Sequence, residues 1–359
     1  MLQSARKTLM NQKLLNFTLS SILVALILLL LYFGSTLLIP FFVSIVIWYL
    51  IISFVGGLTH LPYIGRFIPT WIAYILAIAS AFGLIWLIFT VVSNNITELI
   101  NLAPSYQSRF IELRNELFKL LNISDPPSFN QAFEKFNAMS LLSSAAGIMA
   151  DFGRNVFIIL IYVLFLLLEH HSFDYKLGFL IRDPEKLEKA RNMINKITKQ
   201  IRSYLKIKAL MGLLTAGSSY LILLAVGVNF ADFWALLIFF FNFIPNIGSI
   251  IATILPCLLA LVQFDSATQF LIIAISLAAI QFVIGNILEP RLMGKSFNLS
   301  PLAIIITLSI WGYLWGIVGM LLCVPIIVIV SIIFANFPGT RPIAILLSQN
   351  GDIDLDSSN

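Results

Sequence analysis

Charged residues are scarce in this sequence: Asp, Glu, Lys and Arg make up only 11% of the 359 residues, whereas hydrophobic residues make up 59%. Soluble domains carry about a quarter charged residues, so a soluble globular protein is excluded. A run of about 20 apolar residues matches the thickness of the hydrocarbon core of a bilayer. The composition therefore predicts an all-α, polytopic membrane protein.

Cysteine is also scarce, and the two cysteines, Cys257 and Cys323, lie inside apolar segments without the spacing of a metal site. Free cysteines in such segments behave as small buried hydrophobic residues. The sequence also lacks a phosphate-binding loop, zinc-ligand spacing, a nucleophile and base constellation and an ATP-binding domain. Enzymatic activity and ATP-driven transport by this chain alone are therefore not expected, and neither is a metal or a cofactor.

The apolar residues fall into long runs separated by charged loops. These eight runs lie at about 15–33, 37–55, 70–92, 152–169, 208–228, 231–263, 267–288 and 301–335. The first run has no small-residue cleavage site after a short core, so it is expected to be an uncleaved span. The last run and the run at 231–263 are too long for one ordinary span.

The basic residues predict the orientation, because cytoplasmic loops retain Lys and Arg. The net charge of +5 is therefore attributed to membrane orientation, and nucleic-acid binding is not expected. Arg6, Lys7 and Lys13 place the N-terminus in the cytoplasm. Segment 93–151 carries six acidic and four basic residues and suits the outside, whereas segment 170–208 carries ten basic residues and suits the cytoplasm.

The stretch FFFNFIPNIGSIIATILP, residues 239–256, places Asn242, Pro245, Asn246 and Gly248 where a spanning helix would have its middle. The last apolar run is interrupted in a similar way. When NFADFWALLIFFFNFIPNIGSIIATILPCLLAL is aligned with NLSPLAIIITLSIWGYLWGIVGMLLCVPIIVIV, the two sequences match without a gap. That alignment places Asn229 on Asn298 and Pro256 on Pro325, with Gly248 and Gly316 one position apart. The pairing predicts a twofold repeat, each copy consisting of one span and one broken segment.

Each broken segment either crosses the membrane as a bent helix or enters and leaves on one side as a hairpin. Hairpins place Asp232 and Asp265 outside and Arg291 and Lys295 inside, which fits the positive-inside tendency better. The two repeats would then be inverted, and discontinuous helices in inverted repeats mark the binding site of a secondary transporter. A packing kink is the alternative, because Pro and Gly are frequent in membrane helices.

The break offers uncharged donors and acceptors in Asn242, Asn246 and Ser249, together with free backbone groups at the half-helix ends. Glu289, in GNILEPR, is the best candidate for an ionisable residue at membrane depth; an ion pair with Arg291 is the alternative. A neutral polyol would be bound by amides and aromatic walls, although the tryptophans also suit interfacial anchoring. The candidates for substrate binding or gating are Asn242, Pro245, Asn246, Gly248, Ser249, Gln281, Asn286, Glu289, Trp311, Trp315 and Gly316.

Four stretches resemble the autoinducer-2 exporter family of bacterial membrane proteins: NFIPNIGSIIATILP, GNILEPRLMGKSFNLSPL, LSIWGYLWGIVGMLLCVPIIVIV and RPIAILLSQ. The resemblance is strong over about 200–350 and rests on topology alone over 1–199. The matching motif positions are Asn242, Pro245, Asn246 and Gly248; Glu289, Pro290 and Gly294; and Trp311, Gly312, Trp315, Gly316, Gly319 and Pro325.

The resemblance implies a secondary transporter in the bacterial inner membrane. The basic residues place the N-terminus in the cytoplasm, and both models of the broken segments place the C-terminus there as well. The resemblance implies export of autoinducer-2, a quorum-sensing signal, or of a similar small polar metabolite, by elevator-like alternating access. It also implies a homo-oligomer, with a pentamer as one option. Sodium or lithium exchange for protons is the alternative, and a passive channel or scaffold is a further one. The expected partners are thus a small polar solute, the lipid bilayer and further copies of the chain.

The expected domain organisation follows from these assignments. Residues 1–92 form the scaffold helices, 93–151 a small helical extracytoplasmic region, and 152–207 a membrane helix followed by a basic amphipathic cytoplasmic helix. Residues 208–335 form the transport domain, with repeats 208–263 and 267–335, and 336–359 form a cytoplasmic tail. His60 is expected in a loop, and Glu169, His170 and His171 at the solvated end of the fourth span.

Overall fold

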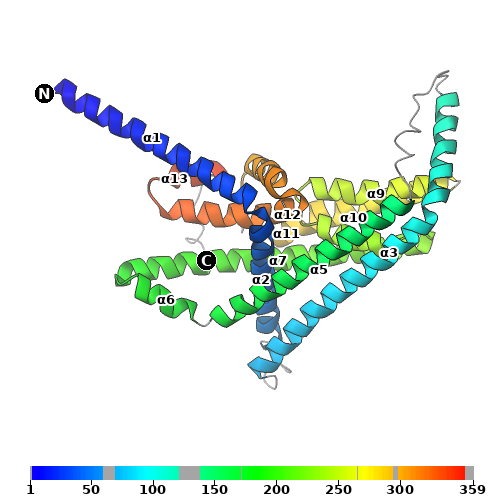
Figure 1. Cartoon of the computed structure of the whole chain (residues 1–359), viewed down its shortest axis with the longest axis horizontal. Coiled ribbons are helices and arrows are strands. Elements are labelled where there is room, and N and C mark those ends of the chain that lie inside the picture. The colour runs from blue at the N-terminus through cyan, green and yellow to red at the C-terminus, as the bar shows by residue number, and fades with distance from the viewer. Residues whose placement is uncertain are drawn as a thin grey trace.

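The computed structural model describes residues 2–59, 69–120, 138–170, 172–264, 266–293 and 298–351 (Figure 1). Over these ranges the chain is helical and contains no β-strand, which confirms the all-α prediction. The elements are α1 (Leu2–Phe33), α2 (Ser35–Thr59), α3 (Thr70–Leu120), α5 (Ala138–Glu169), α6 (Phe173–Leu180), α7 (Pro184–Val226), α8 (Ala231–Phe241), α9 (Ile247–Gln263), α10 (Ala267–Gln281), the π-helix η1 (Phe282–Leu288), α11 (Glu289–Met293), α12 (Pro301–Asn336) and α13 (Arg341–Leu347).

Five helices in the described ranges are long and apolar enough to cross a membrane, or up to six if one bent pair forms a single span. The five are Ser35–Thr59, Thr70–Leu102, Pro184–Val226, Ala267–Met293 and Pro301–Asn336, and the bent pair is Gly153–Glu169 with Phe173–Leu180. Shorter apolar helices cover Thr18–Phe33, Ala231–Phe241 and Ile247–Gln263. A multi-pass membrane protein is supported, and the count of eight segments stays a prediction.

Helix α7 runs without interruption from the basic segment into the apolar one. It begins after Asp183, whose side chain accepts hydrogen bonds from the main-chain N–H groups of Glu185 and Lys186. It ends at Gly227, which has a φ of 81° and caps the helix in the left-handed conformation. The expected domain boundary at 207/208 therefore falls inside one helix, because no Pro or Gly interrupts the chain there.

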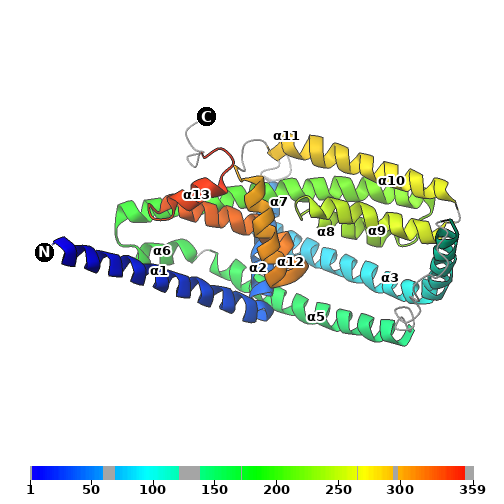
Figure 2. The ribbon, with the colours of Figure 1, turned by 90° about the horizontal axis from the view of Figure 1, so that it is seen from above.

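The first broken segment folds back on itself. Helices α8 and α9 lie side by side (Figure 2), and a Cβ atom on Gly248 would lie 1.8 Å from the main-chain oxygen of Phe241. The two ends of the segment also meet, because Gln263 Nε2 donates to the carbonyl of Gly227 over 2.7 Å. Gln263 Oε1 accepts from the main-chain N–H of Asn229 over 2.8 Å.

Helix α12 contains a comparable turn at Gly316, which has φ 61° and ψ −142°. A Cβ on Gly319 would lie 2.0 Å from the main-chain oxygen of Trp311, whereas a straight helix would separate these two residues by about 12 Å. Asn298, just before α12, accepts hydrogen bonds through Oδ1 from the N–H groups of Gln349 and Asn350, beyond its end. Asn229 and Asn298 occupy equivalent positions in the sequence alignment. Each lies at the start of a broken segment and is hydrogen-bonded to residues at or beyond the end of that segment.

Helix α3 contacts the base of the α8–α9 pair. Asn229 Nδ2 donates to the Tyr106 hydroxyl over 2.7 Å, and Asn95 Nδ2 donates to Asp232 Oδ2 over 3.2 Å. Burial raises the pKa of Tyr106, so the hydroxyl remains neutral at physiological pH. These contacts fix α3 at one end of the α8–α9 pair.

The largest cluster of buried side chains lies where α7 meets the break and α12. It includes Ile201 and Leu205 of α7, Ile244 of the break, and Cys323 and Val328 of α12. Helix α1, by contrast, projects beyond the other helices toward its N-terminal end in Figure 1. Its apolar side chains are exposed from Leu19 to Leu30, as expected of a surface that faces lipid.

The two tight turns predict which glycines tolerate a methyl group. Gly248→Ala and Gly319→Ala place a Cβ against main-chain oxygen, so each is expected to lower the free energy of unfolding by about 1–3 kcal/mol or more. Gly217→Ala in α7 is the matched control, because a Cβ there meets nothing within 4 Å and alanine favours the helix. Thermal unfolding of the purified proteins in detergent measures the difference. Equal stability of all three variants would contradict the tight turns.

Candidate functional site

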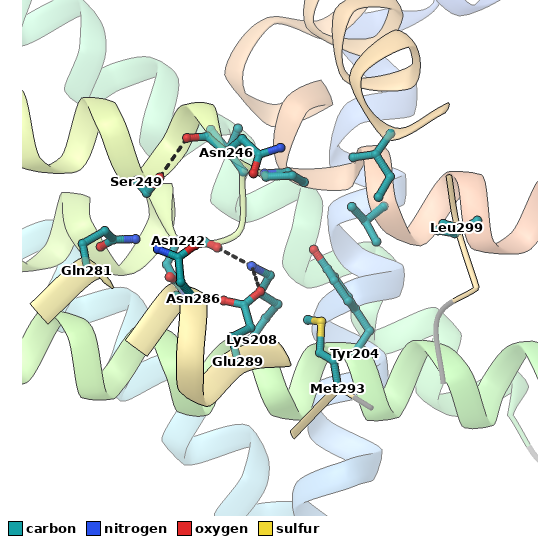
Figure 3. Close-up of a pocket in the computed structure, with 15 residues that line it drawn as sticks. Tyr204, Lys208, Asn242, Asn246, Ser249, Gln281, Asn286, Glu289, Met293 and Leu299 are labelled. Atoms are coloured by element: carbon teal, nitrogen blue, oxygen red, sulfur yellow. Dashed lines mark hydrogen bonds and ion pairs between the residues drawn. The ribbon is translucent and has the colours of Figure 1, made fainter. Parts of the chain in front are cut away.

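A cavity of about 260 Å³ lies at the break between α8 and α9 (Figure 3). Its walls come from α7, the break, α9, α10, η1, α11 and the region around α12. The lining residues are Tyr204, Lys208, Asn242, Ile244, Pro245, Asn246, Ser249, Gln281, Gly285, Asn286, Glu289, Met293, Leu299, Ile304 and Val324. The cavity therefore joins segments that are far apart in the sequence.

The break leaves main-chain carbonyls without helical partners, and α7 supplies donors to two of them. Lys208 Nζ donates to the carbonyl of Asn242 over 2.9 Å. The Tyr204 hydroxyl donates to the carbonyl of Phe243 over 3.4 Å. Tyr204 and Lys208 lie four residues apart on one face of α7, so a single helix face holds two consecutive carbonyls of the break.

Lys208 also forms an ion pair with Glu289, with 2.5 Å between Nζ and Oε1. The side chains are only 8% and 15% exposed. Removing two charges from water costs several kcal/mol per ion, so each charge depends on the other. The C-terminal end of α8 adds partial negative charge near the ammonium group, and the Asn242 carbonyl provides a second oxygen contact.

The π-helix η1 forms the wall of the cavity that carries Gly285 and Asn286. The π-helix begins directly after α10 ends at Gln281. Because its turn is wider, the side chains after Gln281 project in different directions from those that an α-helix would give them. Such π-helical turns are rare and occur frequently at functional sites. In this chain the turn brings Asn286 and, at its end, Glu289 to the same cavity as Asn242.

The Asn242 side chain belongs to a small set of buried polar groups that lack a hydrogen-bond partner in the described part of the chain. The residue is 6% exposed, and its Nδ2 has no hydrogen-bond partner among the described residues. Figure 3 shows this nitrogen on the side of Asn242 that faces Gln281. Buried polar groups nearly always have a partner, so this donor is a candidate contact for a bound solute.

The structure brings seven of the eleven sequence candidates together around the cavity: Asn242, Pro245, Asn246, Ser249, Gln281, Asn286 and Glu289. The other four lie elsewhere. Gly248 forms the tight turn after the break, and Gly316 forms the turn in α12. Trp311 and Trp315 pack on each other with ring centroids 4.6 Å apart, and Trp315 Nε1 donates to the carbonyl of Leu31 in α1. A solute-binding role for these four stays a prediction.

Sequence reasoning missed Lys208 and Tyr204. Lys208 was counted among the ten basic residues of segment 170–208, but the structure buries its side chain. Burial of Tyr204 and Lys208 has one sequence signal: at helical spacing, both fall on the apolar face of the helix that carries Ile197 and Ile201. The sequence left Arg291 as an alternative ion-pair partner of Glu289, and the structure pairs Glu289 with Lys208 on α7.

The remaining ionisable candidates lie away from the cavity or outside the description. Glu169 pairs with Lys176, and both side chains are at least half exposed, which fits a solvated helix end. His60, His171, Gly294, Lys295 and Asp265 lie outside the described residues. In the described part of the chain, no group of three His, Cys, Asp or Glu side chains is placed to hold a metal ion.

A family model described as the AI-2E family transporter matches residues 21–339. The chain belongs to this family. The match covers nearly the whole chain, including the N-terminal half, where the sequence resemblance rested on topology alone. Membership in the AI-2E family confirms the resemblance and supports a role in membrane transport.

Relatives within the AI-2E family carry transport names. A protein of Haemophilus influenzae, provisionally named a transport protein, is 30% identical over 89% of this chain and 92% of its own length. The AI-2 transport protein TqsA of Escherichia coli is 37% identical over 59% of this chain and 60% of its own length. The Escherichia coli protein YhhT, also provisionally named a transport protein, is 30% identical over 72% of this chain and 74% of its own length.

The buried ion pair predicts a strong dependence of each partner on the other. Lys208→Met or Glu289→Gln leaves one uncompensated charge and is expected to lower the free energy of unfolding by about 3–5 kcal/mol. The double variant Lys208→Met/Glu289→Gln should recover part of the loss. Lys189→Met is the control, because its pair with Glu185 on the same helix is exposed and its loss should not measurably change stability. Additive effects of the two single variants in thermal unfolding would contradict the pairing.

Proposed function

We propose that this AI-2E family member is a secondary transporter that exports autoinducer-2 or a similar small polar metabolite. The observation that carries the proposal is the cavity at the α8–α9 break. It combines the amide side chains of Asn242, Asn246, Gln281 and Asn286 with a buried ion pair. Non-helical backbone inside a membrane is tolerated where it is buried in protein or lines a cavity, and this break does both.

The size and chemistry of the cavity favour a small, uncharged, oxygen-rich solute. A volume of about 260 Å³ lies below the range of sites for drug-sized ligands. The unpartnered Nδ2 of Asn242 matches an acceptor oxygen of such a solute. Because Lys208 and Glu289 neutralise each other, the pair adds no net charge that would select for an ion.

We further propose that the two broken segments are re-entrant hairpins in an inverted repeat and that they move in an elevator-like alternating-access cycle. The joined ends of the first segment support a hairpin, because Gln263 bonds to both Gly227 and Asn229. The matching turns at Gly248 and Gly319 support a repeat. Location in the bacterial inner membrane with cytoplasmic termini, and assembly into a homo-oligomer, belong to the same proposal.

Exchange of sodium or lithium for protons is the second candidate. The observation in its favour is Glu289, a carboxylate that is only 15% exposed, because ionisable groups at membrane depth commonly mark ion pathways. Against it, this carboxylate is already paired with Lys208. The neutral solute is therefore preferred.

Transport into proteoliposomes that contain the purified chain separates the two functions. Uptake of labelled autoinducer-2 and sodium-driven proton movement are measured in parallel on the same preparation. We expect autoinducer-2 flux above that of empty liposomes. Cation exchange without autoinducer-2 flux would reverse the ranking of the two functions.

Removal of the Asn246 amide tests the site itself. Asn246→Leu should abolish transport without loss of expression, because it removes a polar contact from the cavity. Asn246 has a φ of 58°, so Asn246→Gly, which accepts that backbone, separates amide loss from strain and should also lose most transport. Asn336→Leu is the control, because its amide bonds to Ile332 in its own helix. Normal transport by Asn246→Gly would mean that the Asn246 amide does not bind the solute and that the break serves helix packing only.

A further inference from the structure

Two oxygen groups from separate segments meet at the Lys208 ammonium (Figure 3). The Glu289 carboxylate lies at 2.5 Å and the Asn242 main-chain oxygen at 2.9 Å from Nζ. Carboxylate and carbonyl oxygens are also the ligands that hard metal cations prefer. The ammonium therefore occupies a position whose surroundings suit a small monovalent cation.

We propose that Lys208 is the resident counter-ion of the cavity, a tethered cation that fills a monovalent-cation site formed by the Glu289 carboxylate and the Asn242 carbonyl. The consequence is that the wild-type chain closes this cavity without a cation from solution. The inference rests on the proposed function in one respect: the closed cavity is taken to be a state in a transport cycle. The cation site itself follows from the contacts alone.

The other groups near the pair leave this role to Lys208. In the described part of the chain, the Tyr204 hydroxyl of α7 and the Cys323 thiol of α12 interact electrostatically with the pair, and neither side chain can carry a positive charge. Glu289 is the anion of the cluster and Lys208 its cation. Without the ammonium, a buried carboxylate and the Asn242 carbonyl would both lose their partner.

The charge balance predicts a gain of cation binding when the lysine is removed. In Lys208→Met, the two oxygens remain and the space of the ammonium becomes available to sodium or lithium. Binding of a cation to the folded state alone raises the free energy of unfolding, and the increase grows with the logarithm of the cation concentration once this exceeds Kd. Wild-type protein should show no such effect, because its own ammonium already fills the site.

Thermal unfolding of the purified full-length protein in detergent tests the proposal. Wild type, Lys208→Met and Lys208→Met/Glu289→Gln are titrated at mildly alkaline pH with sodium, lithium or choline chloride at equal ionic strength. We expect Tm to rise with the concentration of sodium or lithium, relative to choline, for Lys208→Met only. The double variant lacks the carboxylate and should behave as wild type does.

Two results would overturn the proposal: a Lys208→Met protein whose Tm is the same in sodium, lithium and choline, or an equal sodium effect in the double variant. If Lys208→Met does not fold, Lys208→Gln, which keeps a donor toward Asn242, takes its place in the same titration. The measurement uses no transported solute. The result of the titration can therefore be interpreted even if the chain does not transport autoinducer-2.

Discussion

The hydrogen-bonding demand of an interrupted helix determines how this part of the molecule is built. A helix that stops inside an apolar region leaves carbonyl groups that neither water nor a following turn satisfies. Here α7 satisfies two of them, with Lys208 bonded to the Asn242 carbonyl and Tyr204 bonded to that of Phe243. Because one of the two donors is charged, a carboxylate is needed as well, and Glu289 provides it from α11.

This requirement links the architecture to the chemistry of the cavity. The ion pair connects α7, the break and the helix after η1, so the polar groups between them are held in place. Its two charges cancel, so under the proposed function the amide side chains of the cavity would select the solute. Family membership places this arrangement in a transport protein, and the free donor of Asn242 is the group that a solute would reach.

Much of this was predictable from local sequence. Pro245, Gly248 and Gly316 act on their own backbone, so the positions of both breaks could be inferred from them. The gap-free alignment of Asn229 with Asn298 also paired two residues that both bond to chain near the end of a broken segment. The partner of Glu289 could not be predicted in this way, because Lys208 lies far away in the chain and its burial depends on how α7 packs. The π-helical turn at 282–288 has no local signal either.

The α8–α9 pair is held at both of its ends, by the glycine contact at Gly248 and by the amide bonds of Gln263. These contacts hold the two helices together at both ends of the pair. The π-helix η1 lines the same cavity as the break, and π-helical turns are rare and frequent at functional sites. If the cavity changes shape, we expect the change in η1, where the π-helical turn can rewind to an α-helical one, and we expect the joined α8–α9 pair to move as a unit.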